Sequence, residues 1–340
     1  MRPVVLPPNP VPRFYRGGAA IAALRGIPPF GDRVPEDWVG SMTTVFGDGA
    51  LGLSRLPDGR LLREAAAADP IGFFGPEHAA RRGGDPALLV KLLDAGERLP
   101  VHVHPSDPFA REVLGSPYGK TEAWVVIGTA EPTATVSVGF RDDVGGETLE
   151  RWVREQDARG MIDALNPVDV SPGDAIFVPA GVPHVIGEGL LILELQEPSD
   201  LSVLLEWRGF AGGGEGEASL GLCWDVALGC VELAARDPAT LGGRRSQHGS
   251  EVTSLLPAEA DRFFRAERVE ASQSAELDQG FAILVVLEGT ADLQSEGGEP
   301  VRIDRGDTVL LPWSAGACRV EGSLAGVCCR PPAARSGGPA

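Results

Sequence analysis

Residues 172–186 read PGDAIFVPAGVPHVI, and this stretch decides the fold. A Gly-Asp pair predicts a tight turn, the apolar run after it predicts a short buried strand, and a proline ends that strand. Residues 305–320, RGDTVLLPWSAGACRV, repeat the pattern at the same spacing. The matching positions are Gly173 with Gly306, Asp174 with Asp307, and Pro179 with Pro312. The repeat predicts two β-rich units built on one plan.

Composition supports a mainly β protein. The chain has 340 residues, of which 45 are glycine and 29 are proline, and its hydrophobic fraction is 43%. This length and hydrophobic content allow two domains with buried cores. So many Gly and Pro residues favour short strands joined by turns over long helices.

Charge and apolar patterning exclude several classes of protein. The formal net charge of −18 repels nucleic acid and anionic membranes. Apolar runs are too short to span a membrane, and prolines interrupt the N-terminal stretch where a signal sequence would lie. The five cysteines form no CxxC pair and are odd in number, which is a poor basis for disulfides. We therefore expect a cytoplasmic protein that acts on small molecules.

The expected elements give a domain layout. Strand-like stretches alternate with segments of helical spacing at about 61–68, 107–114, 147–165 and 221–235. The predicted parts are a first domain over 13–210 with helical insertions at about 107–116 and 147–165, a helical and loop connection over 211–255, a second barrel-like unit over 256–330, and flexible tails at 1–12 and 331–340.

Three histidines and a glutamate in the first domain form a candidate metal site. His102 and His104 stand at i and i+2 of a predicted strand, so their side chains point to one face. Glu122 heads the next strand, and His184 follows a turn at the end of a later one. Three imidazoles and one carboxylate suit Zn²⁺, and by ligand type also Fe²⁺, Mn²⁺, Co²⁺ or Ni²⁺.

The spacing of these residues resembles that of the cupin superfamily. Residues 96–104, GERLPVHVH, resemble the first cupin motif, and residues 173–188 resemble the second, with Glu188 where an Asn is usual. Seventeen residues separate the histidine pair from Glu122, and the sequence around it, GKTEAW (119–124), is similar to type I mannose-6-phosphate isomerases. Further stretches fit that family, and the resemblance covers the first domain well and the second unit loosely.

The resemblance implies a fold and a metal centre. The fold is a double-stranded β-helix, or cupin jelly roll, with two cupin-like barrels and adjacent helical segments. The implied cofactor is one Zn²⁺ per chain, held by His102, His104, Glu122 and His184. The first of these is commonly Gln in the family, so His102 adds a good ligand. The second barrel is expected to be metal-free, because Ala317 stands where His184 stands in the first.

The resemblance also implies catalytic residues. Lys120, two residues before Glu122 and on the same strand face, is at the position of the family's catalytic lysine. Family members carry an Arg after a Ser-Asp pair, but this chain has Leu204 there, so Arg208 or another Arg would have to replace it. Glu194 has the strand parity to face the cavity as a further catalytic candidate.

The implied reaction interconverts mannose 6-phosphate and fructose 6-phosphate through a cis-enediolate. Two alternatives stay open, since the missing Arg leaves the exact sugar undecided: an isomerase of another sugar or sugar phosphate, and a non-catalytic, metal-containing sugar-binding cupin. A dioxygenase is a third, although Lys120 beside the metal favours an isomerase. Expected partners are a small sugar phosphate, no nucleic acid and no membrane, and the chain is expected to be a monomer or weak homodimer.

Overall fold

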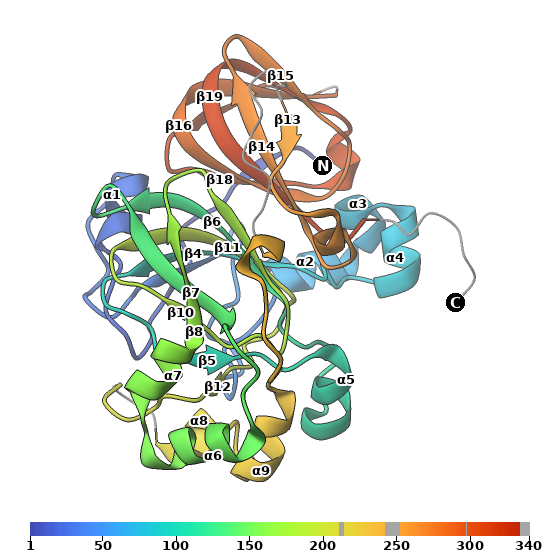
Figure 1. The fold of residues 1–340 in the computed structure, drawn as a ribbon. Coiled ribbons are helices and arrows are strands. Elements are labelled where there is room, and N and C mark those ends of the chain that lie inside the picture. Colours follow the sequence, from blue (N-terminus) through green and yellow to red (C-terminus); the bar gives the residue numbers. More distant parts are fainter. Residues whose placement is uncertain (211–213, 242–251, 297, 334–340) are drawn as a thin grey trace.

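The computed structural model describes residues 1–340 except 211–213, 242–251, 297 and 334–340, and its strands form three antiparallel sheets (Figure 1). The six-stranded sheet runs in the order β2 (Pro10–Val11), β3 (Glu36–Val39), β4 (Leu89–Ala95), β11 (Leu190–Gln196), β6 (Glu122–Thr129) and β9 (Ala175–Val178). The five-stranded sheet runs in the order β12 (Val203–Leu204), β5 (His102–Val103), β10 (His184–Ile186), β7 (Ala134–Phe140) and β8 (Leu165–Val170). The eight-stranded sheet runs in the order β1 (Val4–Val5), β18 (Thr308–Leu311), β16 (Ala282–Ser295), β19 (Cys318–Arg330), β14 (Arg265–Ala271) and β13 (Val252–Ser254), with β15 (Ser274–Leu277) on β19 and β17 (Val301–Asp304) on β16.

Helices are short and lie between or outside the sheets (Figure 1). The α-helices are α1 (Ala19–Arg25), α2 (Leu62–Ala68), α3 (Pro70–Phe74), α4 (Pro76–Arg82), α5 (Asp107–Phe109), α6 (Gly146–Glu155), α7 (Ala158–Ala164), α8 (Glu215–Ala218) and α9 (Trp224–Ala227). Single turns of other types are η1 (Ala110–Leu114), η2 (Leu228–Cys230), η3 (Pro238–Thr240), η4 (Ala258–Arg262) and η5 (Trp313–Ala315). None of the helices in the described part of the chain is long and apolar enough to cross a membrane.

The six-stranded and five-stranded sheets pack face to face and form the first unit, and the eight-stranded sheet forms the second unit. Strand β11 shows how side chains that alternate along a strand fill the cores on its two faces. Leu190 and Ile192 point into the core between the two sheets. Leu191 and Leu193 point the other way, into a core shared with the second β unit. Because side chains alternate along a strand, Glu194 must share the inner face with Ile192. The strand therefore delivers a carboxyl group into the interior of the first unit.

The outer face of the five-stranded sheet is covered by helices. Val101 and Val103 flank His102 in sequence and pack against Leu149 and Val153 of α6. Figure 1 shows α6, α7, α8 and α9 gathered on this side of the first unit. The burial of Val101 and Val103 under these helices leaves the side chain of His102, which lies between them in sequence, pointing inward.

The internal repeat is visible in the structure. Gly173 and Gly306 both have positive φ, 95° and 90°, a region that favours glycine in a tight turn. The strands β9 and β18 follow, and a proline ends each of them. The mainly β architecture with two similarly built units, predicted from this repeat, is confirmed, although the sheets stay open and do not close into barrels.

The prediction of a flexible N-terminal tail over residues 1–12 is wrong. Strand β1 pairs with β18 through Val4 and Leu310, and β2 pairs with β3. Leu6 and Val11 are buried, at 3% and 0% exposure, so this segment gains both backbone pairing and apolar burial. At the other end, Ala333 donates its backbone N–H to the carbonyl of Asp261, and residues 334–340 lie outside the described part.

The prediction of a long helix at about 221–235 is also wrong. Only α9 and the single turn η2 form there. After η2 the chain becomes extended, and the backbone N–H of Glu232 donates to the carbonyl of Gly181 at 2.7 Å. Contacts of the extended backbone with the first unit outweigh the helical spacing of the side chains. The other expected helices near 61–68, 107–114 and 147–165 are present, the last divided into α6 and α7.

Candidate metal and substrate site

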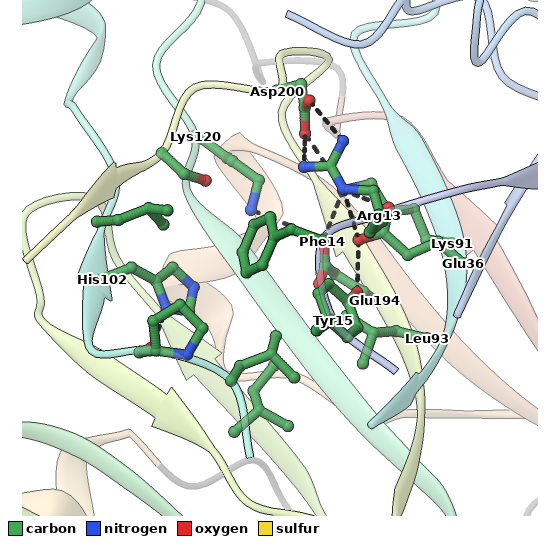
Figure 2. A pocket seen from close by; sticks show the side chains of 15 residues that line it. Arg13, Phe14, Tyr15, Glu36, Lys91, Leu93, His102, Lys120, Glu194 and Asp200 are labelled. Carbon is green, nitrogen blue, oxygen red and sulfur yellow. Dashed lines mark hydrogen bonds and ion pairs between the residues drawn. The ribbon is translucent and has the colours of Figure 1, made fainter. Parts of the chain in front are cut away.

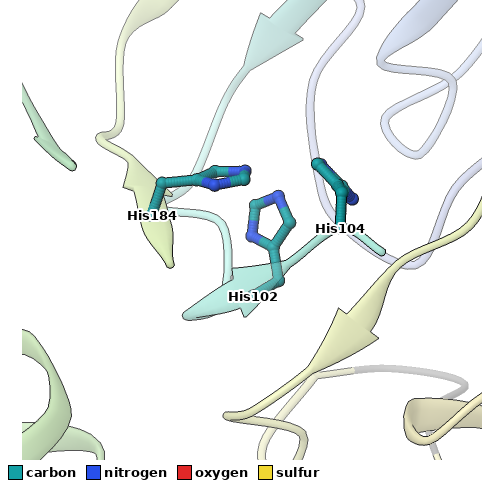
Figure 3. A group of neighbouring side chains, drawn as sticks. All are labelled: His102, His104 and His184. Atoms are coloured by element: carbon teal, nitrogen blue, oxygen red, sulfur yellow. The ribbon is translucent and has the colours of Figure 1, made fainter. Parts of the chain in front are cut away.

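Three histidines from neighbouring strands converge inside the first unit (Figure 3). His102 and His184 are directly paired across β5 and β10, and His104 follows two residues after His102. One ring nitrogen from each lies within 4.8 Å of the others, and all three residues are buried. The ring centroids of His102 and His184 are 4.1 Å apart. The three side chains are therefore close enough to bind one ion.

Backbone carbonyl groups orient each imidazole. Nδ1 of His102 lies 2.8 Å from the carbonyl oxygen of Pro100, and Nδ1 of His184 lies 2.8 Å from that of Val182. Nδ1 of His104 makes the same kind of contact with Leu201, at 2.9 Å. A carbonyl oxygen only accepts hydrogen bonds, so each Nδ1 carries the proton and each Nε2 keeps a free lone pair. This tautomer is the one that metal-binding histidines adopt.

Burial keeps the imidazoles of His102 and His104 neutral, as a metal requires. The pKa of His102 is well below its ordinary value, because burial and then the neighbouring His184 and His104 disfavour the charged form. Burial, together with the ammonium of Lys120, lowers the pKa of His104 to about 3. Nε2 of His184 is buried and has no hydrogen-bond partner among the described residues. An orphaned acceptor of this kind is costly unless a ligand satisfies it.

Glu122 lies against the histidines. One of its oxygens is 3.0 Å from Nε2 of His104, and the other is 3.4 Å from Nε2 of His184. The indole N–H of Trp124 donates to the same carboxylate at 2.9 Å. Burial opposes the ionised form, but the ammonium of Lys120 favours it, and the pKa of Glu122 is well below its ordinary value. The donor set is thus three imidazoles beside an ionised carboxylate, which fits Zn²⁺.

Lys120 is in contact with this donor set. Its ammonium lies 2.5 Å from a carboxylate oxygen of Glu122 and 2.9 Å from Nε2 of His104. The carboxyl group of Glu194 lies 3.8 Å from the same ammonium. Lys120 and Glu194 therefore sit together next to the histidines, as the strand parity of both residues predicted.

A pocket opens beside the histidines (Figure 2). His102 and Lys120 lie on one side of it, and Arg13 and Asp200 on the other. Lys91 also lines the pocket and lies 3.2 Å from a carboxylate oxygen of Glu194. The site thus has a metal-binding end and a second charged end within one cavity.

Arg208 is not among the residues that line this pocket. It lies in an exposed turn, where its backbone N–H donates to the side chain of Gln156 and its guanidinium stacks on the ring of Trp207. Leu204 lines the pocket as an apolar side chain. Among the described residues that line the pocket, Arg13 is the only arginine. Sequence reasoning therefore chose the wrong arginine for the pocket.

A buried network of charges behind Arg13 was not predicted from the sequence. Nη1 of Arg13 lies 3.0 Å from Asp200, and its Nε lies 3.4 Å from Glu36. The hydroxyl of Tyr15 and the indole of Trp38 both donate to Glu36, each at 2.6 Å. One signal was available in the sequence: the acidic residues Glu36 and Asp37 stand directly before the apolar Trp38 and Val39. The structure places all four in β3, where they are buried.

Glu194 lies next to this network. Burial raises its pKa, the ammonium groups of Lys91 and Lys120 offset this rise only in part, and the carboxylates of Glu122 and Glu36 add to it. Lys91 itself stays charged, because Glu194, Glu36 and Asp200 more than offset its burial and raise its pKa. Of the three carboxyl groups around Lys91, Glu194 is thus the one whose pKa is raised, whereas the pKa values of Glu36 and Asp200 are lowered.

The histidine group is the only cluster of potential metal ligands found in the described part of the chain. The position in the second unit that matches His184 is Ala317, an exposed residue between η5 and β19. The five cysteines, all of them described, are free thiols. One metal centre, in the first unit, is what the residues provide.

The comparisons with known proteins agree on one family. Residues 257–330 match the family model described as mannose-6-phosphate isomerase, cupin domain. The chain is 32% identical over 243 residues to the mannose-6-phosphate isomerase ManA of Bacillus subtilis, covering 69% of this chain and 72% of that protein. It is 30% identical over 243 residues to the mannose-6-phosphate isomerase of Streptococcus mutans, covering 70% and 72%.

Solved structures agree in fold. The crystal structure of the mannose 6-phosphate isomerase from Bacillus subtilis matches with a TM-score of 0.76, at 23% identity, over 97% of this chain and 100% of that one. A putative mannosephosphate isomerase from Archaeoglobus fulgidus matches with a TM-score of 0.75, at 24% identity, over 97% and 98%. At these identities the likeness establishes the fold alone, including the second β unit.

Proposed function

Because the chain belongs to the mannose-6-phosphate isomerase family, we propose that it interconverts mannose 6-phosphate and fructose 6-phosphate with the help of one bound Zn²⁺. The observation that carries this proposal is the contact between Lys120 and a set of three imidazoles and a carboxylate. Such a set provides metal binding and proton transfer within one cavity.

Four residues hold the metal in this proposal: His102, His104, His184 and Glu122. The backbone carbonyls at Nδ1 keep the imidazoles rigid, and the indole of Trp124 orients the carboxylate. When bound, Zn²⁺ supplies a Lewis acid that lowers the energy of negative charge developing on the sugar oxygens.

Lys120 moves the carbon-bound proton. The isomerisation takes a proton from C2 of the aldose, passes through a cis-enediolate, and returns a proton to C1. A single amine can do both if it enters the step uncharged, becomes an ammonium by taking the C2 proton, and gives that proton to C1 on the same face of the enediolate. Lys120 is buried at 4% exposure beside the metal-binding residues. Burial also excludes bulk water, which would otherwise exchange or misplace the proton.

Glu194 handles the oxygen-bound proton. The reaction also moves a proton from the hydroxyl oxygen on C2 to the oxygen on C1. Glu194 carries a raised pKa and lies 3.8 Å from Lys120, so it can donate to one oxygen and accept from the other. Lys91, at 3.2 Å, holds the carboxyl group in place.

The direct test is an assay of purified protein with added Zn²⁺ and mannose 6-phosphate, following fructose 6-phosphate. Turnover that disappears with a chelator and returns with Zn²⁺ supports the proposal. Thermal stabilisation by a sugar without any turnover would instead favour a metal-containing sugar-binding protein. Turnover of other aldoses, but not of mannose 6-phosphate, would indicate an isomerase of a different sugar.

A further inference from the structure

One residue at the far end of the pocket has no role in the chemistry proposed above. Arg13 comes from the segment between β2 and α1, 89 residues before His102. Figure 2 shows it facing the cavity on the side away from His102, with Phe14 between the two ends. A sugar whose C1 and C2 lie at the histidines would point its other end in this direction.

Exposure distinguishes Arg13 from the other charged groups of the pocket. Its side chain is 16% exposed, whereas those of Asp200 and Glu36 are 4% and 5% exposed. The side chains of Lys91 and Glu194 are each 3% exposed. In this cluster the guanidinium is therefore the group that an incoming ligand meets, and the carboxylates lie behind it.

The carboxylates behind Arg13 hold it and are themselves satisfied. Asp200 accepts from Nη1 and Nη2 of Arg13 at 3.0 and 3.3 Å, and from the backbone N–H of Phe46 at 3.2 Å. Each of the two Nη atoms carries a second N–H beyond the one given to Asp200. A guanidinium anchored by Asp200 and Glu36 holds its two remaining N–H groups in fixed directions, and either can donate to an oxygen of a phosphate group.

We propose that Arg13 is the specificity-determining residue that binds the phosphate group of the substrate at the far end of this pocket. This inference rests on the proposed function, since it assigns one end of that substrate. Arg13 does not take part in proton transfer. It binds the remote group, and that binding energy positions C1 and C2 at Lys120 and the histidines.

Binding of two non-reacting polyols tests the assignment. Glucitol 6-phosphate and glucitol differ only in the phosphate, and titration calorimetry with the zinc-loaded protein gives the ratio of their dissociation constants. We expect the parent to prefer the phosphate ester, and Arg13→Ala to reduce that preference by about 10- to 100-fold, the effect of losing a charged hydrogen-bonding group. Arg13→Lys, which keeps the positive charge but lacks the planar guanidinium, should show a preference between those of the parent and Arg13→Ala.

Two further variants show whether the effect is local. Arg16→Ala removes an exposed arginine three residues away that is absent from the described pocket lining, and it should keep the parent ratio. Arg13→Ala combined with Leu204→Arg places a guanidinium on another residue that lines the same pocket, and it should recover part of the preference. Zinc content and the melting temperature of each variant identify any that fail to fold, in which case Arg13→Lys alone decides.

Two results would overturn the inference. One is a parent with no preference for the phosphate ester, which would indicate a pocket for uncharged sugars. The other is an unchanged preference in Arg13→Ala. Turnover of mannose 6-phosphate is measured separately in the parent. A parent that prefers glucitol 6-phosphate through Arg13 but does not isomerise mannose 6-phosphate would contradict the proposed function and leave this assignment standing.

Discussion

The ammonium of Lys120 lies 2.9 Å from Nε2 of His104. That nitrogen has a single lone pair, so it cannot contact both the ammonium and a metal ion. We expect metal binding to move Lys120 away from His104 and toward Glu194, which lies 3.8 Å from the ammonium. Occupation of the metal site would then place the lysine where the proposed proton transfer needs it.

Replacing Lys120 separates proton transfer from metal binding. Lys120→Met should lower kcat/KM for mannose 6-phosphate by about 10²- to 10⁴-fold, the usual contribution of a general acid–base group. Zinc content should not fall, because the substitution removes a cation that competes for His104. Lys120→Arg should be equally inactive, since a guanidinium does not release its proton. Elemental analysis and steady-state kinetics check both statements, and loss of zinc from Lys120→Met would contradict this role.

Replacing His104 should lower the zinc content of the protein, whereas replacing Lys120 should not. His104→Ala removes one of three imidazoles, so zinc content should fall well below one per chain and activity should fall with it. His78→Ala is the matched control, because His78 lies on α4 and contacts the carbonyl of Asp85, away from the cluster. Excess Zn²⁺ should restore part of the activity of His104→Ala. A variant that keeps a full complement of zinc would remove His104 from the ligand set.

Stability should fall with rising pH through one buried carboxyl group. Burial, aided by the neighbouring Asp107, raises the pKa of Glu197 to about 7, and the backbone N–H of Thr121 holds the group at 2.8 Å. A carboxyl group with a raised folded pKa binds more protons in the native state than in the unfolded state. Its contribution is complete below its unfolded pKa and is lost as pH rises through about 7.

The variant Glu197→Gln isolates this effect. An uncharged amide does not titrate, so the free energy of unfolding of the variant should rise relative to the parent by about 2 kcal/mol between pH 5 and pH 8. Urea titrations of both proteins at the two pH values measure the difference. Glu188→Gln, at an exposed position, should show no such drift. A constant difference between Glu197→Gln and the parent would mean that Glu197 is ionised throughout this range.

The N-terminal segment should contribute to stability as a structural element. Leu6 packs in the core shared by the two β units, so Leu6→Ala should lower the free energy of unfolding by about 2–4 kcal/mol. Arg2→Ala, at an exposed position in the same segment, should change it by less than about 0.5 kcal/mol. Urea unfolding checks the pair, and equal effects of the two substitutions would restore the view of this segment as a loose tail.

Local spacing was enough to predict the residues that share a strand face. The parity of His102 with His104, and of Lys120 with Glu122, placed four side chains toward one interior, and the structure brings them together. Glu194 followed from the same rule. Alternation along a strand depends only on backbone geometry, which explains why it could be read from the sequence.

The residues that the sequence did not reveal depend on contacts between distant segments. Arg13 enters the pocket because Asp200 and Glu36, which come from other parts of the chain, bind it there. Arg208 had the favourable sequence position, but the chain turns outward after β12. No periodic pattern encodes where a loop goes after its strand ends, so only the folded chain shows which arginine the pocket contains.

The pairing of Val4 with Leu310 also constrains how the protein is made. A ribosome delivers the N-terminal end first, and β18, the strand that β1 joins, is translated about 300 residues later. The nascent segment before Arg13 therefore lacks one of its two sheet partners until those residues have been made. The first unit can collapse during translation, but its N-terminal segment reaches its final place after the second unit has folded.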